Sequence, residues 1–545
     1  MYFISIYLIS IIMMLKFYLF GKNFIKIFLK NSTKNKNNIF RNYDLLSIFL
    51  GFFWYGNILI VFNFFIPIKF LALILFVVIL IIEFKTISEF LKTNKFSIFM
   101  MGFFIPSMYN NNPSQDANMY HFYIQEMFRS EKINLGISNF DPLYGLGSIF
   151  DYVSSTLWIS SSYSLIQLLN LIFLTSFFNL LLTEIQLNNH VLKNISIAIV
   201  IIGILDNFGL GGGRNGFFFI QEIGKFDSSY AIIFFLCALL FYKVTLEKDF
   251  QSINFYLLIF FATFLSQIRT FGYLFFVTIL ILLFLENKII FLIKNSGFVF
   301  FNLLWALKNL LSTGCLIYPV SFTCIETLPW ESTSQTYELS ANAIRNNRNP
   351  NDKNAEISSL NWIDDYWFSE NIDYLLNFLL TFTLIFIFFN LFQKSQKIKR
   401  NKYSNLNTLN LLLFLISWFF LYPNYRFASG IFISIYIFFN INKISNFQLY
   451  IKNIRSIKLS ILVLLIITAG LVVRVDSYKA FISNFNQNLL TKYELNTPEL
   501  KKRVGSYGYS SKETYCFGEL TCSNSKQKTQ KNYLGSYSIY IPIKN

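Results

Sequence analysis

Residues 226–242 read FDSSYAIIFFLCALLFY, an apolar run that opens with one carboxylate, Asp227. A run of roughly 15–20 apolar residues is long enough to cross the hydrocarbon core of a membrane as a helix. Comparable runs recur roughly every 20 to 40 residues along the chain, with charged breaks between them. One very large soluble core would not be interrupted in this way, so the sequence predicts a multi-pass membrane protein.

The composition of the 545-residue chain agrees with this class, since 54% of the residues are hydrophobic and 14% are charged. Soluble domains carry about 25% charged residues. The formal net charge is +17, but Phe, Ile, Asn and Lys dominate throughout, so part of this charge reflects a compositional bias. We therefore expect membrane lipids as the surroundings of the protein and no nucleic-acid partner.

The apolar windows predict an all-α helical bundle of about 12–14 transmembrane helices. The first window lacks a small-residue cleavage site and contains Lys16, which favours a retained span over a cleaved signal peptide. The candidate spans lie near residues 2–20, 45–64, 67–83, 96–108, 164–183, 192–206, 229–242, 254–268, 271–285, 296–312, 373–392, 406–422, 429–441 and 458–474.

Basic clusters give the orientation, because Lys and Arg are enriched in cytoplasmic loops. Such clusters lie at 22–41, 85–95, 394–402 and 443–458. Alternation from these clusters places five segments on the outer side, namely 109–163, 207–228, 313–372, the turn 423–428 and the tail 475–545. The expected organisation is one membrane domain, 1–474, followed by a small outer C-terminal segment, 475–545.

The cysteines offer a check on this orientation. Cys315 with Cys324, and Cys516 with Cys522, form two close pairs in segments assigned to the outer side, whereas Cys237 lies inside a span. Close pairs in an oxidising compartment favour disulfides, and four unrelated thiols are the alternative interpretation. The cysteine placement agrees with an orientation derived from the basic residues alone.

The segment 113–130, PSQDANMYHFYIQEMFRS, follows an early span. If Asp116 caps a helix, the aromatic side chains form one stripe, and His121, Gln125 and Arg129 line another face. This pattern predicts a helix that lies on the membrane surface with its aromatic side down. A purely structural role is the alternative, in which Asp116 caps the helix and His121 lies on its solvated face. The position of both residues just outside the bilayer favours contact with a headgroup or a lipid-borne substrate.

A second group of polar residues precedes the span 229–242. Asp227 stands at its start, where a carboxylate serves as an N-cap or as a ligand. The run GLGGGR at 209–214 offers backbone N–H groups and the Arg214 guanidinium to a phosphate. A flexible loop is the alternative interpretation of this glycine-rich run.

Three cations, Arg269, Lys308 and Arg426, lie at the predicted outer face, where the topology rule does not account for them. A lipid phosphate or pyrophosphate is the simplest anion to justify all three. Binding of ordinary phospholipid headgroups by each cation is the alternative. The sequence contains no Walker A pattern, no convincing dinucleotide fingerprint and no metal-type cysteine cluster.

The order of these features resembles the GT-C superfamily of multi-pass glycosyltransferases, which includes the dolichyl-phosphate-mannose protein mannosyltransferases. The D…YH form, the KN…TGC…YP stretch and the terminal cysteine pair are also similar to a family of bacterial membrane proteins of that fold. The matching elements are Asp116 with Tyr120-His121, Asp227 at a span start, Arg269 at a span end, Lys308-Asn309 with Thr313-Gly314 and Tyr318-Pro319, and the turn Pro423-Asn424-Tyr425-Arg426-Phe427.

The resemblance implies an inverting transfer of a sugar from a polyprenyl-phosphate donor to a lipid or glycan acceptor at the periplasmic face of the bacterial inner membrane. It implies that Asp116 activates or orients the acceptor hydroxyl, with His121 as a helper. Asp227 would hold a divalent metal, Mg²⁺ or Mn²⁺, or position the donor. Many members carry two adjacent acids where this chain has Asp116-Ala117, which weakens the case for a metal in this loop. The cations that would neutralise the leaving phosphate are Arg269, Lys308, Arg426 and Arg214.

Three other classes stay open. An O-antigen ligase or polymerase depends on a large late outer loop, and here 313–372 contains no histidine, which counts against a ligase. A flippase or exporter of lipid-linked glycans predicts charged residues inside several spans, whereas these spans are mostly Phe, Leu and Ile. A structural membrane protein without chemistry is the third class.

Overall fold

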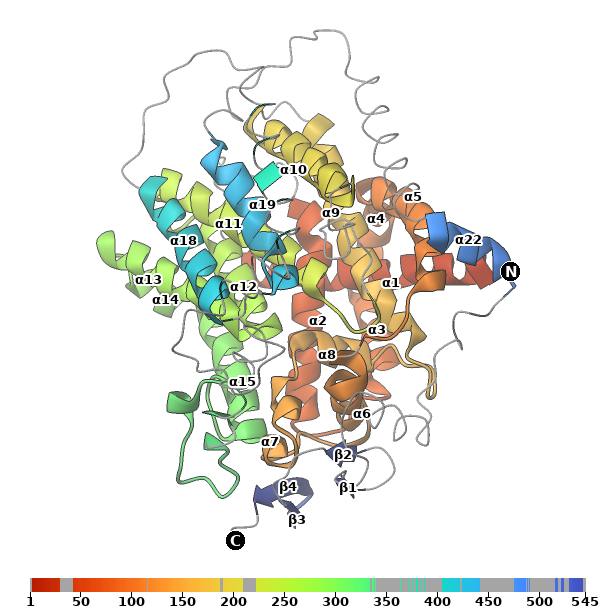
Figure 1. Ribbon diagram of the computed structural model, residues 1–545, viewed down its shortest axis with the longest axis vertical. Coiled ribbons are helices and arrows are strands. Elements are labelled where there is room, and N and C mark those ends of the chain that lie inside the picture. Colours follow the sequence, from red (N-terminus) through yellow and green to blue (C-terminus); the bar gives the residue numbers. More distant parts are fainter. Residues whose placement is uncertain are drawn as a thin grey trace.

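The computed structural model is predominantly helical (Figure 1). The described residues are 2–29, 43–114, 116–186, 190–208, 222–333, 404–421, 424–441, 475–486, 515–517, 521–523 and 529–542, with isolated positions between 336 and 387 and at 488 and 490.

The helices fall into an N-terminal and a C-terminal group that pack side by side (Figure 1). The first group contains α1 (Tyr2–Phe24), α2 (Ser47–Asn63), α3 (Leu71–Ile82), α4 (Ile87–Thr93), α5 (Lys95–Phe104), α6 (Phe122–Ser130), α7 (Ile137–Phe140), α8 (Ile149–Ser155), α9 (Leu168–Gln186) and α10 (His190–Phe208). The second contains α11 (Asp227–Glu247), α12 (Ile253–Ile268), α13 (Leu274–Leu285), α14 (Ile290–Lys294), α15 (Ser296–Thr313), α18 (Ser404–Leu421) and α19 (Ser429–Phe439), and α22 (Val475–Ser483) follows.

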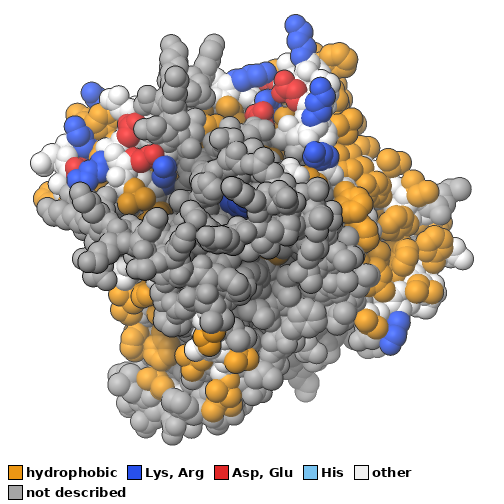
Figure 2. Space-filling model, turned by 90° about the horizontal axis from the view of Figure 1, so that it is seen from above, with side chains coloured by type: hydrophobic (Ala, Val, Ile, Leu, Met, Phe, Trp, Pro, Cys, Tyr) orange, Lys and Arg blue, Asp and Glu red, His pale blue; other side chains and the backbone are white. Residues whose placement is uncertain are grey.

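Four helical stretches among the described residues are long and apolar enough to cross a membrane: Tyr2–Leu29, Tyr43–Asn63, Ser164–Gln186 and Asp227–Glu247. The pair Leu71–Ile82 and Phe84–Thr93, bent by 77°, makes a fifth if it is one span. Hydrophobic side chains also cover one flank of the molecule in the view from above (Figure 2). The protein is therefore a helical membrane protein, as its apolar runs predict.

The part of the chain that the structure describes holds fewer complete spans than the expected 12–14, because other apolar windows form shorter helices. The helices Ile253–Ile268, Thr270–Leu285, Leu406–Leu421 and Ser429–Phe439 have only 10–17 residues each. A helix rises about 1.5 Å per residue, so the shorter ones do not reach across a hydrocarbon core of about 30 Å. The predicted span 458–474 and most of 373–392 lie outside the described residues.

Close backbone contact joins α1 to α2. A Cβ atom on Gly21 would lie 1.8 Å from the carbonyl oxygen of Ser47, and one on Gly51 would lie 1.7 Å from that of Phe17. Only glycine permits this approach, which is typical of helix pairs in membranes, where small residues allow backbones to touch. The pair forms the centre of the N-terminal group.

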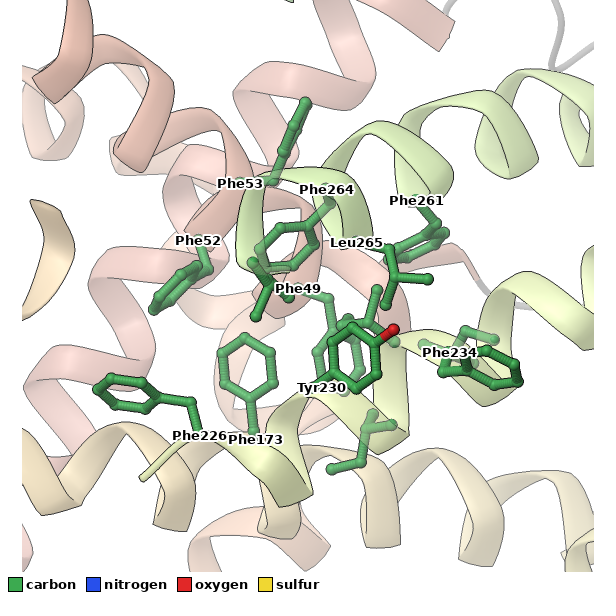
Figure 3. Close-up of a cluster of buried hydrophobic side chains, with 14 of the residues drawn as sticks. Phe49, Phe52, Phe53, Phe173, Phe226, Tyr230, Phe234, Phe261, Phe264 and Leu265 are labelled. Carbon is green, nitrogen blue, oxygen red and sulfur yellow. The ribbon is translucent and has the colours of Figure 1, made fainter. Parts of the chain in front are cut away.

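An aromatic cluster joins this pair to the C-terminal group (Figure 3). Phe52 of α2 meets Phe173 of α9 edge to face, with ring centroids 5.0 Å apart. It also lies 5.7 Å from Phe264 of α12. Aromatic pairs in this geometry stabilise a core beyond the area that they bury. Phe226 and Tyr230 extend the cluster to the beginning of α11, so the core supports the residues around Asp227.

Four of the segments predicted to lie outside meet at one end of the bundle (Figure 1). The backbone N–H of Ser114 donates to Ile223 (3.0 Å), and that of Leu135 donates to Ser538 in the tail (2.9 Å). Asn139 donates to the carbonyl oxygen of Trp330 (3.0 Å). The predicted outer loops therefore share one assembly.

The C-terminal segment adds β structure to an otherwise helical protein. Two antiparallel hairpins form, from β1 (Tyr515–Phe517) with β2 (Thr521–Ser523) and from β3 (Thr529–Leu534) with β4 (Tyr537–Pro542). The expected all-α class therefore needs correction at the tail. The register of the first hairpin places Cys516 opposite Cys522 in the backbone, while the bond expected between their side chains lies outside what the structure describes.

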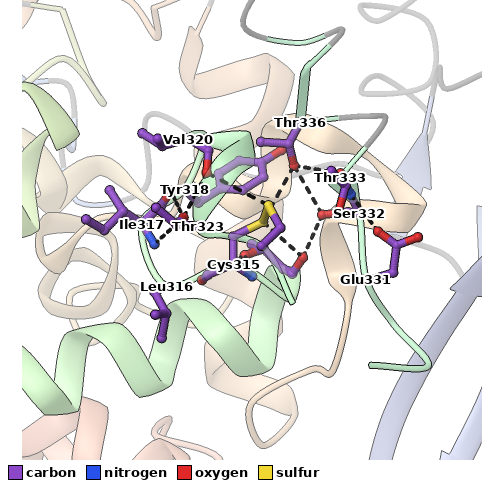
Figure 4. The surroundings of a disulfide bond; sticks show 12 residues. Cys315, Leu316, Ile317, Tyr318, Val320, Thr323, Glu331, Ser332, Thr333 and Thr336 are labelled. Carbon is purple, nitrogen blue, oxygen red and sulfur yellow. Dashed lines mark hydrogen bonds between the residues drawn. A yellow bond between two sulfur atoms is a disulfide. The ribbon is translucent and has the colours of Figure 1, made fainter. Parts of the chain in front are cut away.

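The other cysteine pair forms the expected disulfide. Cys315 and Cys324 are joined across an antiparallel bridge that closes the loop after α15 (Figure 4). Ser332 donates to the carbonyl oxygen of Thr313 beside it (2.6 Å). The same loop carries Tyr318, whose hydroxyl donates to the carbonyl oxygen of Pro142 (2.7 Å). The disulfide loop is thus tied to the segment between α7 and α8.

Candidate functional site

A pocket of about 320 Å³ opens where these segments meet. Its wall includes the start of α11, the end of α12, one face of α15 and the turn before α19. Small-molecule sites in proteins have volumes of about 300–1,000 Å³ and combine apolar walls with a few polar groups. The predicted site residues in the wall of the pocket are Asp116, His121, Asp227, Arg269 and Arg426.

Asp116 lies at the start of a π-helical turn, Ala117–His121, that leads into α6. The expectation that Asp116 caps this helix with its side chain is wrong, because the Ser114 hydroxyl accepts the hydrogen bond from the Ala117 N–H (3.1 Å). The Asp116 carboxylate is therefore available for an ion pair, and π-helical turns are frequent at functional sites.

Arg426 is the partner of Asp116. Its Nη2 donates to Asp116 Oδ2 (2.7 Å), although the two residues lie 310 positions apart in the sequence. Burial alone would raise the pKa of the Asp116 carboxyl, but the positive charges of Arg426 and His121 outweigh burial and hold the pKa below its ordinary value. Asp116 is therefore ionised at neutral pH. The pKa of Arg426 is raised, since the carboxylates of Asp227 and Asp116 outweigh its burial.

Asp227 lies next to the Asp116–Arg426 pair, so that carboxylates and guanidiniums alternate along the pocket. Its carboxylate is 3% exposed and pairs with the Arg269 guanidinium through Oδ1, while Oδ2 lies 3.9 Å from Arg426 Nε. The Phe427 ring packs against both arginines. Its centroid lies 4.0 Å from the Arg269 guanidinium carbon and 4.8 Å from that of Arg426. Two carboxylates and two guanidiniums thus line one wall of the pocket. Each arginine has five N–H donors, so donors are left for a ligand anion.

His121 forms a second polar group with a residue that the sequence did not reveal. Its Nδ1 lies 2.8 Å from Oδ1 of Asp151, which is fully buried in α8. Asp151 Oδ2 accepts hydrogen bonds from the Ser148 N–H and hydroxyl, both at 2.8 Å. Gln125 Nε2 donates to Oδ1 (3.1 Å). Burial opposes ionisation of Asp151, but His121 and these donors outweigh it and lower the pKa of the carboxyl.

The polar face of α6 turns into the protein, which corrects the predicted surface helix. Gln125 is completely buried and Arg129 is 4% exposed. Arg129 donates to the carbonyl oxygens of Ser155 (3.2 Å) and Ser160 (3.0 Å). The helix therefore packs its polar face on the segment after α8, because these carbonyl groups need buried donors.

Lys308 takes a different place from the one expected. It is 1% exposed and does not belong to the wall of the pocket. Its Nζ donates to the carbonyl oxygen of Gly147 (2.8 Å), and it lies over the Trp305 ring. Gly147 and Trp305 do line the pocket. Lys308 thus holds a wall of the pocket and does not face its interior.

Two further expectations concern Arg214 and a metal. Arg214 lies outside the described residues. Among the residues that are described, no three His, Cys, Asp or Glu side chains gather as metal ligands. Asp227 faces two guanidiniums, which would repel a divalent cation. The donor set around Asp227 does not fit Mg²⁺ or Mn²⁺.

Sequence reasoning missed Asp151 and Trp158, and it gave Gln125 no role beyond the polar face of a helix. Trp158 Nε1 donates to Gln125 Oε1 (2.9 Å). The one available signal was the pattern Ser148-x-x-Asp151, which is typical of a capping box. The structure forms this box at the start of α8. The pattern indicates a helix start and contains no information about His121, which lies 30 residues earlier.

The sequence profile of a family described as a domain of unknown function, DUF8201, matches residues 1–433. The chain belongs to the DUF8201 family. No curated protein and no solved structure matches the chain. All residues that line the pocket lie within the DUF8201 region, whereas the C-terminal hairpins lie beyond it.

Proposed function

We propose that this protein is a glycosyltransferase that moves a sugar from a polyprenyl-phosphate donor to a cell-envelope acceptor at the outer face of the bacterial inner membrane. The observation that carries the proposal is the convergence of Asp116, Asp227, Arg269 and Arg426 in one pocket at the end of a membrane helix bundle. These four residues are among those that the GT-C resemblance implies.

The two arginines support the phosphate part of the proposal. Each arginine donates to a carboxylate and has further N–H groups next to the pocket. As the bond between the sugar and the phosphate breaks, negative charge grows on the leaving phosphate. Fixed guanidiniums stabilise such charge more strongly in a partly buried site than in water, and loss of one such donor costs about 10²–10³ in rate.

The aromatic wall of the pocket supports the proposal that the ligand contains a sugar and a lipid chain. Trp305, Phe271, Trp418 and Phe427 line the same pocket as the charged residues. Aromatic side chains offer flat apolar faces to the C–H faces of a sugar or to a prenyl chain, while polar groups fix orientation. A pocket that combines both kinds of wall suits a ligand with an apolar tail, a phosphate and a sugar.

The carboxylates support the part of the proposal that concerns the sugar acceptor. Asp116 is ionised and held by Arg426, so it is able to accept a hydrogen bond from an acceptor hydroxyl. No step requires a metal ion in this scheme, because the guanidiniums provide the positive charge. Of the cations that the sequence analysis assigned to the phosphate, Arg269 and Arg426 keep this role and Lys308 does not.

The test uses cells that produce the protein, and it works whichever sugar is transferred. The wild-type gene is replaced by the Asp116→Asn variant, and polyprenyl-phosphate-linked sugars are measured in lipid extracts by mass spectrometry. We expect one lipid-linked sugar to accumulate and the corresponding envelope glycan to lose that sugar. Equal lipid-linked sugar levels in both strains would overturn the proposal.

The matched control is Asp249→Asn. Asp249 lies in the turn between α11 and α12, at the opposite end of α11 from Asp227. The α11 helix has 21 residues, so the two ends lie about 30 Å apart. We expect wild-type lipid levels for this variant, with both variants present in the membrane in equal amounts.

A further inference from the structure

The His121–Asp151 pair is held by several hydrogen bonds beside the pocket. Asp151 is completely buried, and its two oxygens accept from four groups, His121 Nδ1, Gln125 Nε2 and both donors of Ser148. A buried carboxylate with this many donors stays ionised and fixed in orientation.

This arrangement decides the tautomer of His121. An ionised carboxylate only accepts hydrogen bonds, so Nδ1 must carry the proton. In the neutral imidazole, Nε2 then holds the lone pair. Trp158 Nε1 donates to Gln125 Oε1 (2.9 Å), which turns the Gln125 amide so that its NH₂ group faces Asp151. Three side chains thus hold the imidazole in one protonation pattern.

The imidazole itself lines the pocket. Its ring lies 4.1 Å from the Tyr120 ring and 6.0 Å from the Phe226 ring, centroid to centroid. Within the part of the chain that the structure describes, the only hydrogen bond of the His121 ring is the one through Nδ1. Nε2 is therefore left for a group that enters the pocket.

We propose that His121 is the base that takes the proton of the acceptor hydroxyl, and that Asp151 and Gln125 are positioning residues for it. This inference rests on the proposed function. The acceptor O–H bond breaks as its proton moves to Nε2, and the oxygen forms the new bond to the anomeric carbon. The bond from that carbon to the phosphate oxygen breaks, and polyprenyl phosphate leaves with the electron pair.

Asp116 is less suited to this role than the sequence suggested. A base works best when its pKa lies near the working pH. Burial raises the pKa of Asp116, but Arg426 and His121 outweigh burial and lower the pKa below its ordinary value. Histidine is the side chain that most often serves as a general base in enzymes. Asp116 thus orients the hydroxyl and holds Arg426, and His121 receives the proton.

Several ionisable groups surround the His121–Asp151 pair. Those that face it from the neighbouring elements are Asp116, Tyr120, Asp227, Lys225, Arg269, Lys308 and Arg426.

The first test reads the tautomer directly and does not require activity. The chain contains two histidines, so ring-¹⁵N histidine labelling gives two imidazoles, and the His190→Gln variant leaves His121 alone. We expect the Nδ1–H tautomer in the neutral form of the wild-type protein. An Nε2–H tautomer in that protein would overturn the inference, whatever the fate of the proposed function.

The Asp151→Asn variant sharpens this test. The Asn oxygen is needed by the Ser148 N–H, so the new NH₂ group faces Nδ1 and favours the Nε2–H tautomer. If this variant does not fold, Trp158→Phe removes the donor that orients Gln125 and gives a milder change. An unchanged tautomer in a folded Asp151→Asn protein would count against the positioning role.

The second test measures transfer against pH with a polyprenyl-phosphate sugar in proteoliposomes. We expect His121→Asn to slow transfer by at least about 100-fold. Asp151→Asn should lower the rate and move the acid limb of the profile to lower pH, because the imidazolium loses its carboxylate. Asp151→Glu should restore part of the rate. The His190→Gln control should match wild type.

The outcomes separate the two proposals. A wild-type protein that consumes no polyprenyl-phosphate donor contradicts the proposed function. The tautomer measurement then still tests whether Asp151 fixes the tautomer of His121. A wild-type protein that transfers sugar, with a His121→Asn variant equally fast, overturns the role of His121 alone.

Discussion

Asp227 and Arg269 form an ion pair at the pocket that has a measurable cost when it is broken. Asp227 is 3% exposed and Arg269 is 33% exposed. Arg269→Gln leaves the buried carboxylate with Arg426, at 3.9 Å, as its remaining guanidinium partner. We expect a loss of about 2–3 kcal/mol in the free energy of unfolding, below the value for a fully buried pair because Arg269 is partly solvated.

A double-mutant cycle checks this prediction. Asp227→Asn in the Arg269→Gln background removes a buried charge that has lost its closest partner, so we expect it to restore part of the lost stability. Denaturation of the four proteins in the same detergent gives the coupling energy. Additive effects of the two substitutions would mean that the pair does not contribute to stability.

The pH dependence of stability follows from Asp116. Its pKa in the folded protein is lowered, because Arg426 and His121 outweigh burial. The carboxylate therefore contributes stability that is fully present above the unfolded pKa, about 3.9, and is lost as the pH falls through the folded value. We expect the stability difference between wild type and Asp116→Asn to shrink as the pH falls below about 4. A difference that stays unchanged below that pH would contradict the ion pair.

At the residue scale, four of the charged residues that the sequence singled out lie together in the wall of the pocket. Asp116, Asp227, Arg269 and Arg426 stood out because ionisable residues are rare beside apolar runs, and all four meet in the pocket. Asp151 did not stand out, since a carboxylate three residues after a serine is common at a helix start. Its pairing with His121 depends on how α6 and α8 pack, which no local pattern contains.

At the scale of elements, the disulfide loop fixes one wall of the pocket. Cys315 and Cys324 are nine residues apart, and the loop between them carries Tyr318. Thr270 donates to the carbonyl oxygen of Tyr318 (2.6 Å), which connects this loop to the end of α12. The loop thus connects the end of α15 to the residues that follow α12 beside the pocket.

Replacing Cys315 and Cys324 by serine should destabilise this wall of the pocket. A cross-link over a short loop stabilises by about 2–3 kcal/mol, so we expect a loss of that size in a background where Cys516 and Cys522 are already serine. Reductant should destabilise the background protein by the same amount and leave the double variant unchanged. Equal stability of the two proteins without reductant would show that the bond has no structural role.

The positions of most helices were predictable at this scale, while their lengths were not. The apolar window 254–268 became α12, and 296–312 became α15, with ends that differ by at most one residue. Hydropathy does not reveal where a helix ends inside a bundle, so windows such as 96–108 gave a short helix followed by a turn. Among the described residues, fewer complete spans form than the apolar windows predicted for this reason.

At the scale of the whole molecule, the C-terminal hairpin fastens the polar end of the bundle. Tyr540 is 1% exposed and pairs its backbone N–H with the carbonyl oxygen of Leu135 (2.9 Å). Lys531 lies 3.1 Å from the carboxylate of Glu131. A segment close to the C-terminus therefore holds the residues that follow α6.

The substitution Tyr540→Ala tests this fastening. Loss of a large buried aromatic side chain costs about 3–5 kcal/mol, and here we expect the cost to appear as faster tryptic cleavage at Lys132, beside the hairpin. Tyr533→Ala is the matched control, since Tyr533 belongs to the same hairpin and is 73% exposed. Equal cleavage rates for the two variants would mean that the hairpin does not hold this segment.

The central claim is that one pocket breaks the bond between a sugar and a polyprenyl phosphate. The most direct measurement is the release of free polyprenyl phosphate from defined donors in proteoliposomes that contain the purified protein. We predict that wild type releases it in step with sugar transfer, and that Asp116→Asn and Arg426→Gln each do so at least about 100-fold more slowly. Release at the wild-type rate by both variants would contradict the account.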